Sequence, residues 1–163
     1  MAVGRERYKS VLRRWASGVS VVTTRAGERL AGMTVTSFTA VSLDPPLVSF
    51  CADKKALTLP VLQEAGVFAV NVLAVDQHEL SARFALSGNE DLRFDGIECG
   101  AGPTGAPWLP GTVAVLDCRT VATYDAGDHV ICVGRVEEAA LDATREPLLY
   151  YDGAYRRLAA IGS

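Results

Sequence analysis

Short stretches of β-branched and apolar residues, each ended by turn-forming residues, constrain the fold of this chain more than any other feature. The first of them, Val-Ser-Val-Val-Thr-Thr, occupies residues 19–24. Comparable stretches follow at 30–41, 47–51, 67–73, 112–124, 129–138 and 148–158. Such side chains favour extended backbone, and Asp44-Pro45-Pro46 forms a firm break because proline cannot donate to a sheet ladder. The pattern predicts six or seven strands, joined mostly by short turns.

Helical patterns occur in only three places between these strands. They cover residues 5–17, 56–65 and 76–86. In the first, Tyr8, Val11, Leu12 and Trp15 recur at helical spacing, and Gly18 is expected to end the helix. The third is expected to begin with Asp76 as its N-cap.

Residues 87–110 are rich in Gly, Pro, Asn and Asp, which predicts an irregular excursion with one short strand near 97–100. Strands outnumber helices and do not alternate with them along the chain, as they would in a parallel α/β fold. A closed antiparallel barrel with peripheral helices fits this order best.

Length and composition place the chain among ordinary globular proteins. Its 163 residues are 49% hydrophobic and 21% charged, which fits one domain spanning 1–163. The net charge of -3 and the lack of a basic run argue against a nucleic-acid partner. No apolar stretch has the length of a signal peptide or a membrane span, so we expect a cytoplasmic protein without membrane contact.

The motifs of the common catalytic classes are missing from the sequence. It contains no G-x-S-x-G elbow, no Walker loop, no H-E-x-x-H and no G-x-G-x-x-G. The four cysteines are scattered without a C-x-x-C pair, which favours buried free thiols over a metal site. A barrel without these motifs can still hold a cofactor that supplies the chemistry.

The most polar strand region carries five hydroxyl residues in the nine positions 34–42, after Gly32. It begins with Met33, Thr34, Val35, Thr36 and Ser37. Hydroxyl groups and free backbone N–H groups can bind a polar ring system without adding charge. The alternative is an exposed Thr-rich strand, which composition alone favours because threonine is a good strand former.

A second polar cluster follows the strand at 47–51. Two of the three lysines, Lys54 and Lys55, stand next to Asp53 and just before a predicted helix. A helix start with an adjacent cation is a good phosphate site. A solvated loop is the simpler alternative.

Histidine and arginine supply two further candidate groups. His129 follows Gly127-Asp128 at the start of a strand, where it is either a proton donor or ring-orienting group, or a hairpin residue without a role. Arginine stands beside an aromatic residue twice, at Arg83-Phe84 and Arg93-Phe94, and an ion pair beside a core ring is the alternative in both places. Together these clusters point to a phosphate-bearing aromatic cofactor.

On these residues the chain resembles the flavin reductase-like family. These are short-chain NAD(P)H:flavin oxidoreductases that often serve as the small component of two-component flavin monooxygenases. The matching stretches, in order, are 15–24, 32–48, 68–73, 76–77, 84–85, 127–129, 134–136, 147–150 and 153–155. Each is short, and their order and spacing carry the resemblance.

The resemblance implies a mainly β fold, an antiparallel six- to seven-stranded split barrel of Greek-key type that binds FMN and forms a homodimer. It implies that the flavin lies against Met33, Thr34, Val35, Thr36 and Ser37, with its phosphate end near Cys51, Ala52, Asp53, Lys54, Lys55 and Thr58. It places Arg83 and Phe84 near the flavin phosphate or the bound nucleotide, His129 beside the flavin where the nicotinamide stacks, and Tyr155 at the closing G-x-Y motif. The chain departs from the family at Val35, where a small residue is common, and at Lys54 and Lys55, where a serine is usual.

The activity that the resemblance implies is hydride transfer from NADH or NADPH to FMN or FAD, with reduced flavin passing to a separate monooxygenase. Two other classes stay open. One is a split-barrel flavoprotein that holds its flavin tightly and reduces another substrate, and the other is a non-catalytic flavin- or haem-binding barrel. The sequence decides neither the flavin nor the nicotinamide.

Overall fold

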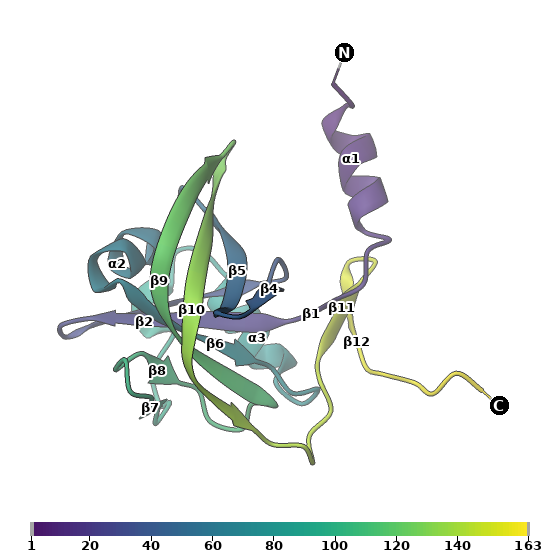
Figure 1. Ribbon diagram of the computed structural model, residues 1–163. Coiled ribbons are helices and arrows are strands. Elements are labelled where there is room, and N and C mark those ends of the chain that lie inside the picture. The colour runs from purple at the N-terminus through teal and green to yellow at the C-terminus, as the bar shows by residue number, and fades with distance from the viewer. Residues whose placement is uncertain (1, 163) are drawn as a thin grey trace.

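Seven strands form one continuous antiparallel sheet in the computed structural model, which describes residues 2–162 (Figure 1). Their order across the sheet is β3-β2-β6-β9-β10-β5-β4. The strands are β2 (Ser20–Ala26), β3 (Arg29–Val35), β4 (Thr39–Leu43), β5 (Pro46–Asp53), β6 (Val67–Val72), β9 (Ala114–Ala126) and β10 (His129–Leu141). β3 and β4 are the two edges of this order. The predicted mainly β, antiparallel split barrel is confirmed.

Strands from opposite ends of this order share one hydrophobic core, so the sheet is rolled around it. Met33 of β3 and Phe50 of β5 belong to the same buried cluster as Phe68 of β6. The rings of Phe50 and Phe68 meet edge to face with centroids 5.1 Å apart. Because the inward side chains fill the barrel, any ligand site must lie at its rim or at the split.

Two small sheets lie outside the barrel. One joins β1 (Ser17–Gly18), β11 (Leu149–Tyr151) and β12 (Ala154–Arg156), and the other joins β7 (Gly100–Ala101) and β8 (Pro107–Trp108). The segment predicted at 148–158 as a strand or hairpin is therefore a hairpin. The single short strand expected near 97–100 is half of a two-stranded hairpin at 100–108.

The helices are α1 (Arg5–Leu12), α2 (Thr58–Ala65), α3 (His78–Ala85) and the 3-10 turn η1 (Glu90–Leu92). α2 ends at Gly66, whose φ of 64° suits glycine, and Pro60 lies in the first turn, where no backbone donor is needed. No helix within residues 2–162 is long and apolar enough to cross a membrane.

The helix predicted over 5–17 is shorter than expected, because α1 ends at Leu12 and Gly18 lies in β1. None of its residues is buried, and in Figure 1 it stands clear of the barrel. Its apolar spacing therefore does not face the core of its own chain. Without a packed face, nothing in the fold extends the helix through Trp15.

The stretch 30–41, predicted as one strand, is two strands in the structure. β3 pairs with β2 as far as Val35, and β4 pairs with β5 from Thr39 onward. Ser37, between them, accepts a hydrogen bond on its Oγ from the backbone N–H of Cys51 at 2.9 Å. This crossing between the two edges of the sheet forms the split.

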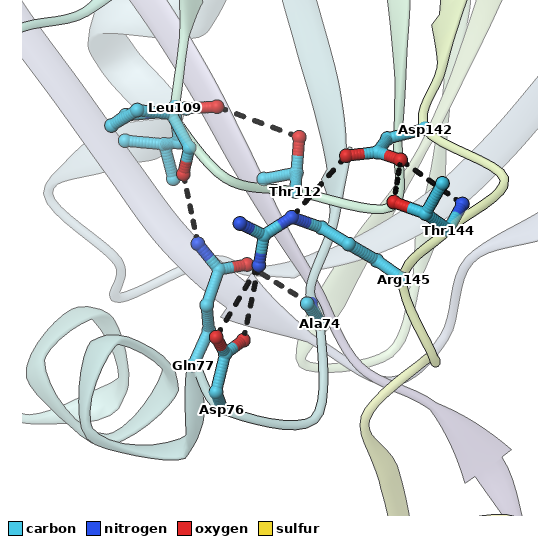
Figure 2. Close-up of polar contacts among 9 residues, drawn as sticks. Ala74, Asp76, Gln77, Leu109, Thr112, Asp142, Thr144 and Arg145 are labelled. Carbon is cyan, nitrogen blue, oxygen red and sulfur yellow. Dashed lines mark hydrogen bonds and ion pairs between the residues drawn. The ribbon is translucent and has the colours of Figure 1, made fainter.

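Asp76 is not the N-cap of the third helix, which begins at His78. Figure 2 shows its carboxylate facing Arg145, whose Nη1 lies 3.3 Å from Oδ2. Gln77 supplies the local contacts instead, accepting from the backbone N–H of Ala74 at 2.9 Å and donating to the carbonyl of Pro110 at 2.8 Å. These contacts fix the start of α3, whose other end reaches the site described next.

Candidate functional site

A cavity of about 450 Å³ lies at the split of the barrel. Its lining comes from four places: β3 and the turn after it, the end of β5 with the following loop, the end of α3 with the excursion, and the start of β10. The lining residues are Met33, Thr34, Val35, Thr36, Ser37, Cys51, Asp53, Lys55, Ala56, Leu57, Phe84, Ala85, Ser87, Glu90, Arg93 and His129. Its volume falls in the range typical of small-ligand sites.

The edge strand β3 forms one wall of the cavity. In the sheet of residues 2–162 it pairs only with β2, so its outer backbone edge faces the split. The carbonyl of Gly32 on this strand accepts hydrogen bonds from Thr58 Oγ1 at 3.0 Å and from Arg93 Nη1 at 2.6 Å. The other backbone N–H and C=O groups on this edge are available to a ligand, in the same way that an exposed sheet edge can pair with an added strand.

The hydroxyl groups of this wall are engaged in different ways. Thr34 donates to the carbonyl of Ser81 at 2.7 Å and so ties β3 to α3. Ser37 is bound to the backbone of Cys51. Thr36 is exposed, and its hydroxyl has no hydrogen-bond partner among residues 2–162. Thr36 and the backbone are therefore the free polar groups of the segment.

The two lysines of the second cluster have different surroundings. Lys54 is not among the lining residues and pairs with Asp125, with 3.0 Å between Nζ and Oδ2. Lys55 lines the cavity, and its backbone N–H donates to Asp53 Oδ1 at 2.8 Å. Only one of the two lysines is therefore placed for an anionic ligand.

Arg93 adds a buried cation that faces the same space. Its Nη1 donates to Gly32 and its Nη2 donates to the carbonyl of Leu86, both at 2.6 Å, and Glu90 lies 3.6 Å from Nη2. Its Nε–H is buried and has no hydrogen-bond partner among the described residues. Burial lowers the pKa of this guanidinium, since desolvation disfavours the charged form.

His129 lies at the start of β10, on the side of the cavity next to Asp53, with which it pairs in register. Its Nδ1 lies 2.7 Å from Asp128 Oδ1. The hydrogen bond from His129 lowers the pKa of Asp128, so this carboxylate stays ionised at neutral pH. With Nδ1 engaged in this way, Nε2 is the ring nitrogen left for a ligand.

The structure brings ten of the fifteen predicted site residues to this cavity: Met33, Thr34, Val35, Thr36, Ser37, Cys51, Asp53, Lys55, Phe84 and His129. Five lie elsewhere. Ala52 is fully buried in the barrel, and Lys54 pairs with Asp125. Thr58 lies behind Gly32, beside a second cavity. Arg83 donates to the carbonyl of Asp95 at 2.7 Å, and the hydroxyl of Tyr155 donates to Ser81 at 2.9 Å.

The site residues implied by the family resemblance include none between 85 and 128, yet Ser87, Glu90 and Arg93 line the cavity. A signal was present in the repeated arginine–aromatic pair. Of the two, Arg83 holds the excursion together, while Arg93 reaches the cavity. The two phenylalanines pack edge to face, with the centroids of Phe84 and Phe94 5.1 Å apart.

An antiparallel split barrel with a polar, cation-bearing cavity at its split is the architecture of a nucleotide-cofactor-binding class of protein. A family model described as "Flavin reductase like domain" matches residues 12–159. The chain belongs to the flavin reductase-like family, as its sequence predicts.

Individual relatives agree with this assignment. The chain is 44% identical to the reductase component of 4-hydroxyphenylacetate 3-monooxygenase from Thermus thermophilus, over 94% of this chain and 97% of that protein. It is 43% identical to the FMN reductase (NADH) SmoA of Agrobacterium fabrum, over 92% of this chain and 84% of the relative. The solved NADH:FAD oxidoreductase SgcE6 of Streptomyces globisporus superposes with a TM-score of 0.90 at 36% identity, covering 100% of this chain and 94% of that one.

Proposed function

We propose that this chain reduces FMN or FAD with NADH or NADPH and that the flavin binds in the cavity at the split of the barrel. The observation that carries the proposal is the convergence of the β3 edge, Lys55 and His129 on one cavity. Relatives named as NADH-dependent flavin reductases support it. The chain is an oxidoreductase of its family, and the choice of nicotinamide and flavin belongs to the proposal.

The residues of the cavity fit a flavin. Met33 and Val35 of β3 and Phe84 of α3 are buried apolar side chains that line the cavity, which suits an aromatic ring system. Lys55 and the buried guanidinium of Arg93 suit a phosphate group. The nearby carboxylates have partners of their own, since Asp53 binds the Lys55 N–H and Glu90 faces Arg93.

Each group of residues has a separate task in this proposal. Bound flavin supplies the hydride-accepting chemistry. The outer edge of β3 would offer main-chain hydrogen bonds to the flavin, and Thr36 would add a hydroxyl at the rim. His129, whose ring is oriented by Asp128, would hold the nicotinamide beside the flavin, and this would reduce the entropic cost of bringing the two reactants together.

A diffusible flavin fits the site better than a permanently held one. Thr36, Ser37, Asp53, Lys55 and Leu57, which line the cavity, are all exposed. A rim that stays open to solvent suits release, whereas a sealed pocket would hold the ligand. A flavoprotein with tightly bound flavin is the second candidate, and a yellow protein after purification would favour it.

We also propose that the chain forms a homodimer and that it delivers reduced flavin to a separate monooxygenase. The exposed apolar residues of α1 support a second copy: Tyr8 is 54% and Val11 64% exposed, and apolar surface of this kind marks interaction sites. Relatives named as reductase components of monooxygenases support the delivery of reduced flavin. Light scattering during gel filtration tests the dimer directly.

The decisive experiment follows absorbance of NADH with purified protein and FMN, FAD or no added flavin. We expect consumption that requires flavin and turns it over many times. No consumption with either flavin and either nicotinamide would leave only a binding barrel and refute the proposed reductase activity.

A further inference from the structure

Tyr155 belongs to the closing G-x-Y motif, yet it is not among the residues that line the cavity at the split. It lies in β12 and is half-buried, and its ring packs against the buried cluster that contains Phe84. Its hydroxyl donates to Ser81 Oγ at 2.9 Å, between residues 74 positions apart in the chain. None of the roles proposed above uses this contact.

Ser81, which accepts this hydrogen bond, is a buried residue within α3. Its side chain binds Tyr155 on β12, while its backbone carbonyl accepts a hydrogen bond from Thr34 Oγ1 on β3 at 2.7 Å. One residue of the helix is therefore bound from two sides, by β12 and by β3. Since Thr34 lines the cavity, this connection ends at the cavity wall.

α3 depends on such contacts for its position. It has eight residues, which is too short for a helix to be stable without contacts to the rest of the chain. Gln77 holds its start by two hydrogen bonds to backbone groups outside the helix (Figure 2). Near its other end, Phe84 and Ala85 line the cavity. Ser81 lies between these two ends, so its contacts determine where the cavity-lining residues of α3 lie.

The hydroxyl of Ser81 needs its partner. A buried hydroxyl without a hydrogen bond is costly, because it loses its contact with water and gains nothing in return. Among the described residues, that partner is the hydroxyl of Tyr155. Without it, a helical serine can turn to the carbonyl four residues earlier, here that of Gln77, and such bonds often bend helices. A bend at this point would move Phe84 and Ala85 relative to β3.

We propose that Tyr155 is a positioning residue for flavin binding, acting through Ser81 on the walls that α3 and β3 form. Its ring supports the cluster around Phe84, and its hydroxyl fixes the helix against Thr34. The closing G-x-Y motif then serves the site without contact between its tyrosine and the flavin or the nicotinamide. The inference rests on the proposed function, because flavin is the ligand that the cavity is proposed to bind.

The test measures flavin affinity in a double-mutant cycle of Tyr155→Phe and Ser81→Ala. Either change removes the same hydrogen bond, and Tyr155→Phe keeps the packed ring. We expect each to raise the Kd for FMN about fivefold, the size of one lost hydrogen bond, and the double variant to raise it no further. At saturating FMN and NADH, kcat should keep its wild-type value, because Tyr155 does not touch the reactants.

Hydrogen exchange without flavin reports on the helix itself. Amides of α3 should exchange faster in Tyr155→Phe, while those of β6 and β9 should keep their wild-type rates. Saturating FMN should restore the protection of α3. Tyr151→Phe is the matched control, because this hydroxyl lies on the same hairpin but accepts from Arg14 Nη1 at 3.4 Å. It should change neither the exchange of α3 nor the Kd for FMN.

Three results would overturn the inference. A wild-type Kd for FMN in Tyr155→Phe would leave Tyr155 with a structural role only. Multiplied losses in the double variant would make Tyr155 a direct ligand contact. Faster exchange throughout the barrel would show general destabilisation instead of a local effect on α3. If the wild-type protein failed to oxidise NADH, the proposed reductase activity would be wrong, while FMN titration and exchange would still test this inference.

Discussion

The guanidinium of Arg93 donates a hydrogen bond to the carbonyl oxygen of Gly32 at 2.6 Å, between residues 61 positions apart in the chain. Nη2 of the same guanidinium donates to the carbonyl of Leu86, so the Arg93 side chain joins β3, the end of α3 and the excursion. These are three of the elements that border the cavity at the split of the barrel. Arg93 is therefore placed to hold the walls of the site together.

Replacing Arg93 should cost stability and flavin affinity together. Arg93→Met removes a buried cation with two charge-assisted hydrogen bonds and leaves Glu90 without its partner, at a cost of about 3 kcal/mol in the free energy of unfolding. Urea denaturation measures the first effect and flavin titration the second. Arg119→Met, at an exposed position, is the control and should change stability by less than about 0.5 kcal/mol. Equal stability of the two variants would show that the Arg93 contacts are not structural.

Gly32 should not tolerate a side chain. A β-carbon there would lie 2.7 Å from Cε1 of Phe84, a fully buried ring, and 3.2 Å from the carbonyl oxygen of Val22. Gly32→Ala should therefore push α3 from β3, lower stability by about 1–3 kcal/mol and weaken flavin binding. Gly18→Ala, where a β-carbon meets nothing within 4 Å, is the matched control. A fully stable Gly32→Ala protein with normal flavin affinity would contradict the tight packing.

His129→Ala should affect nicotinamide use more than flavin affinity. If the ring positions the nicotinamide, its removal should lower kcat/KM for NADH about a hundredfold, the effect of a small misplacement of the reactants. The Kd for flavin, measured by fluorescence titration, should change little. His78→Ala, at the other and exposed histidine, provides the control. Unchanged steady-state kinetics in His129→Ala would refute its proposed role.

Bound flavin should protect one cysteine from alkylation. Cys51 lines the cavity and is half-buried, while Cys118 and Cys132 are buried in the barrel. In the native protein, N-ethylmaleimide should label Cys51 and, more slowly, Cys99, because burial raises the pKa of the Cys99 thiol. Saturating FMN should slow labelling of Cys51 alone, as followed by peptide mass spectrometry. Equal labelling of Cys51 with and without FMN would place the flavin elsewhere.

Alkaline pH should destabilise the protein through its two buried thiols. Burial raises the pKa of Cys118 to about 12 and that of Cys132 to about 11. The unfolded chain loses these protons near the ordinary value of 9.0, while the folded protein retains them, so stability falls as pH rises above that value. Urea denaturation between pH 8 and 11 measures the slope, using roughly the range set by these values. The double variant Cys118→Ala, Cys132→Ala should show a shallower slope, and an unchanged slope would contradict the assignment.

The succession of β-branched stretches determined the class of fold, because backbone propensity and turn chemistry are local properties. The same locality explains why α2 ends at Ala65, as the helical pattern over 56–65 predicted, whereas the ends of several other elements differ from the prediction. α1 stops at Leu12 because no part of its own chain packs on its apolar side. The break between β3 and β4 arises from a contact of Ser37 with Cys51, fourteen residues away, which no local pattern contains.

The candidate site, like the fold, was predictable from the sequence only in part. The sequence by itself indicated the Met33–Ser37 wall, the lysine cluster and His129, because motif order and residue chemistry are visible in the chain. Only the tertiary structure decided that Lys55 faces the cavity while Lys54 pairs with Asp125, and that Arg93 reaches the cavity while Arg83 does not. Two lysines, or two arginines that each precede a phenylalanine, look alike in the sequence. Their roles differ because the rolled sheet and the excursion bring distant backbone carbonyls and carboxylates close to one member of each pair and not to the other.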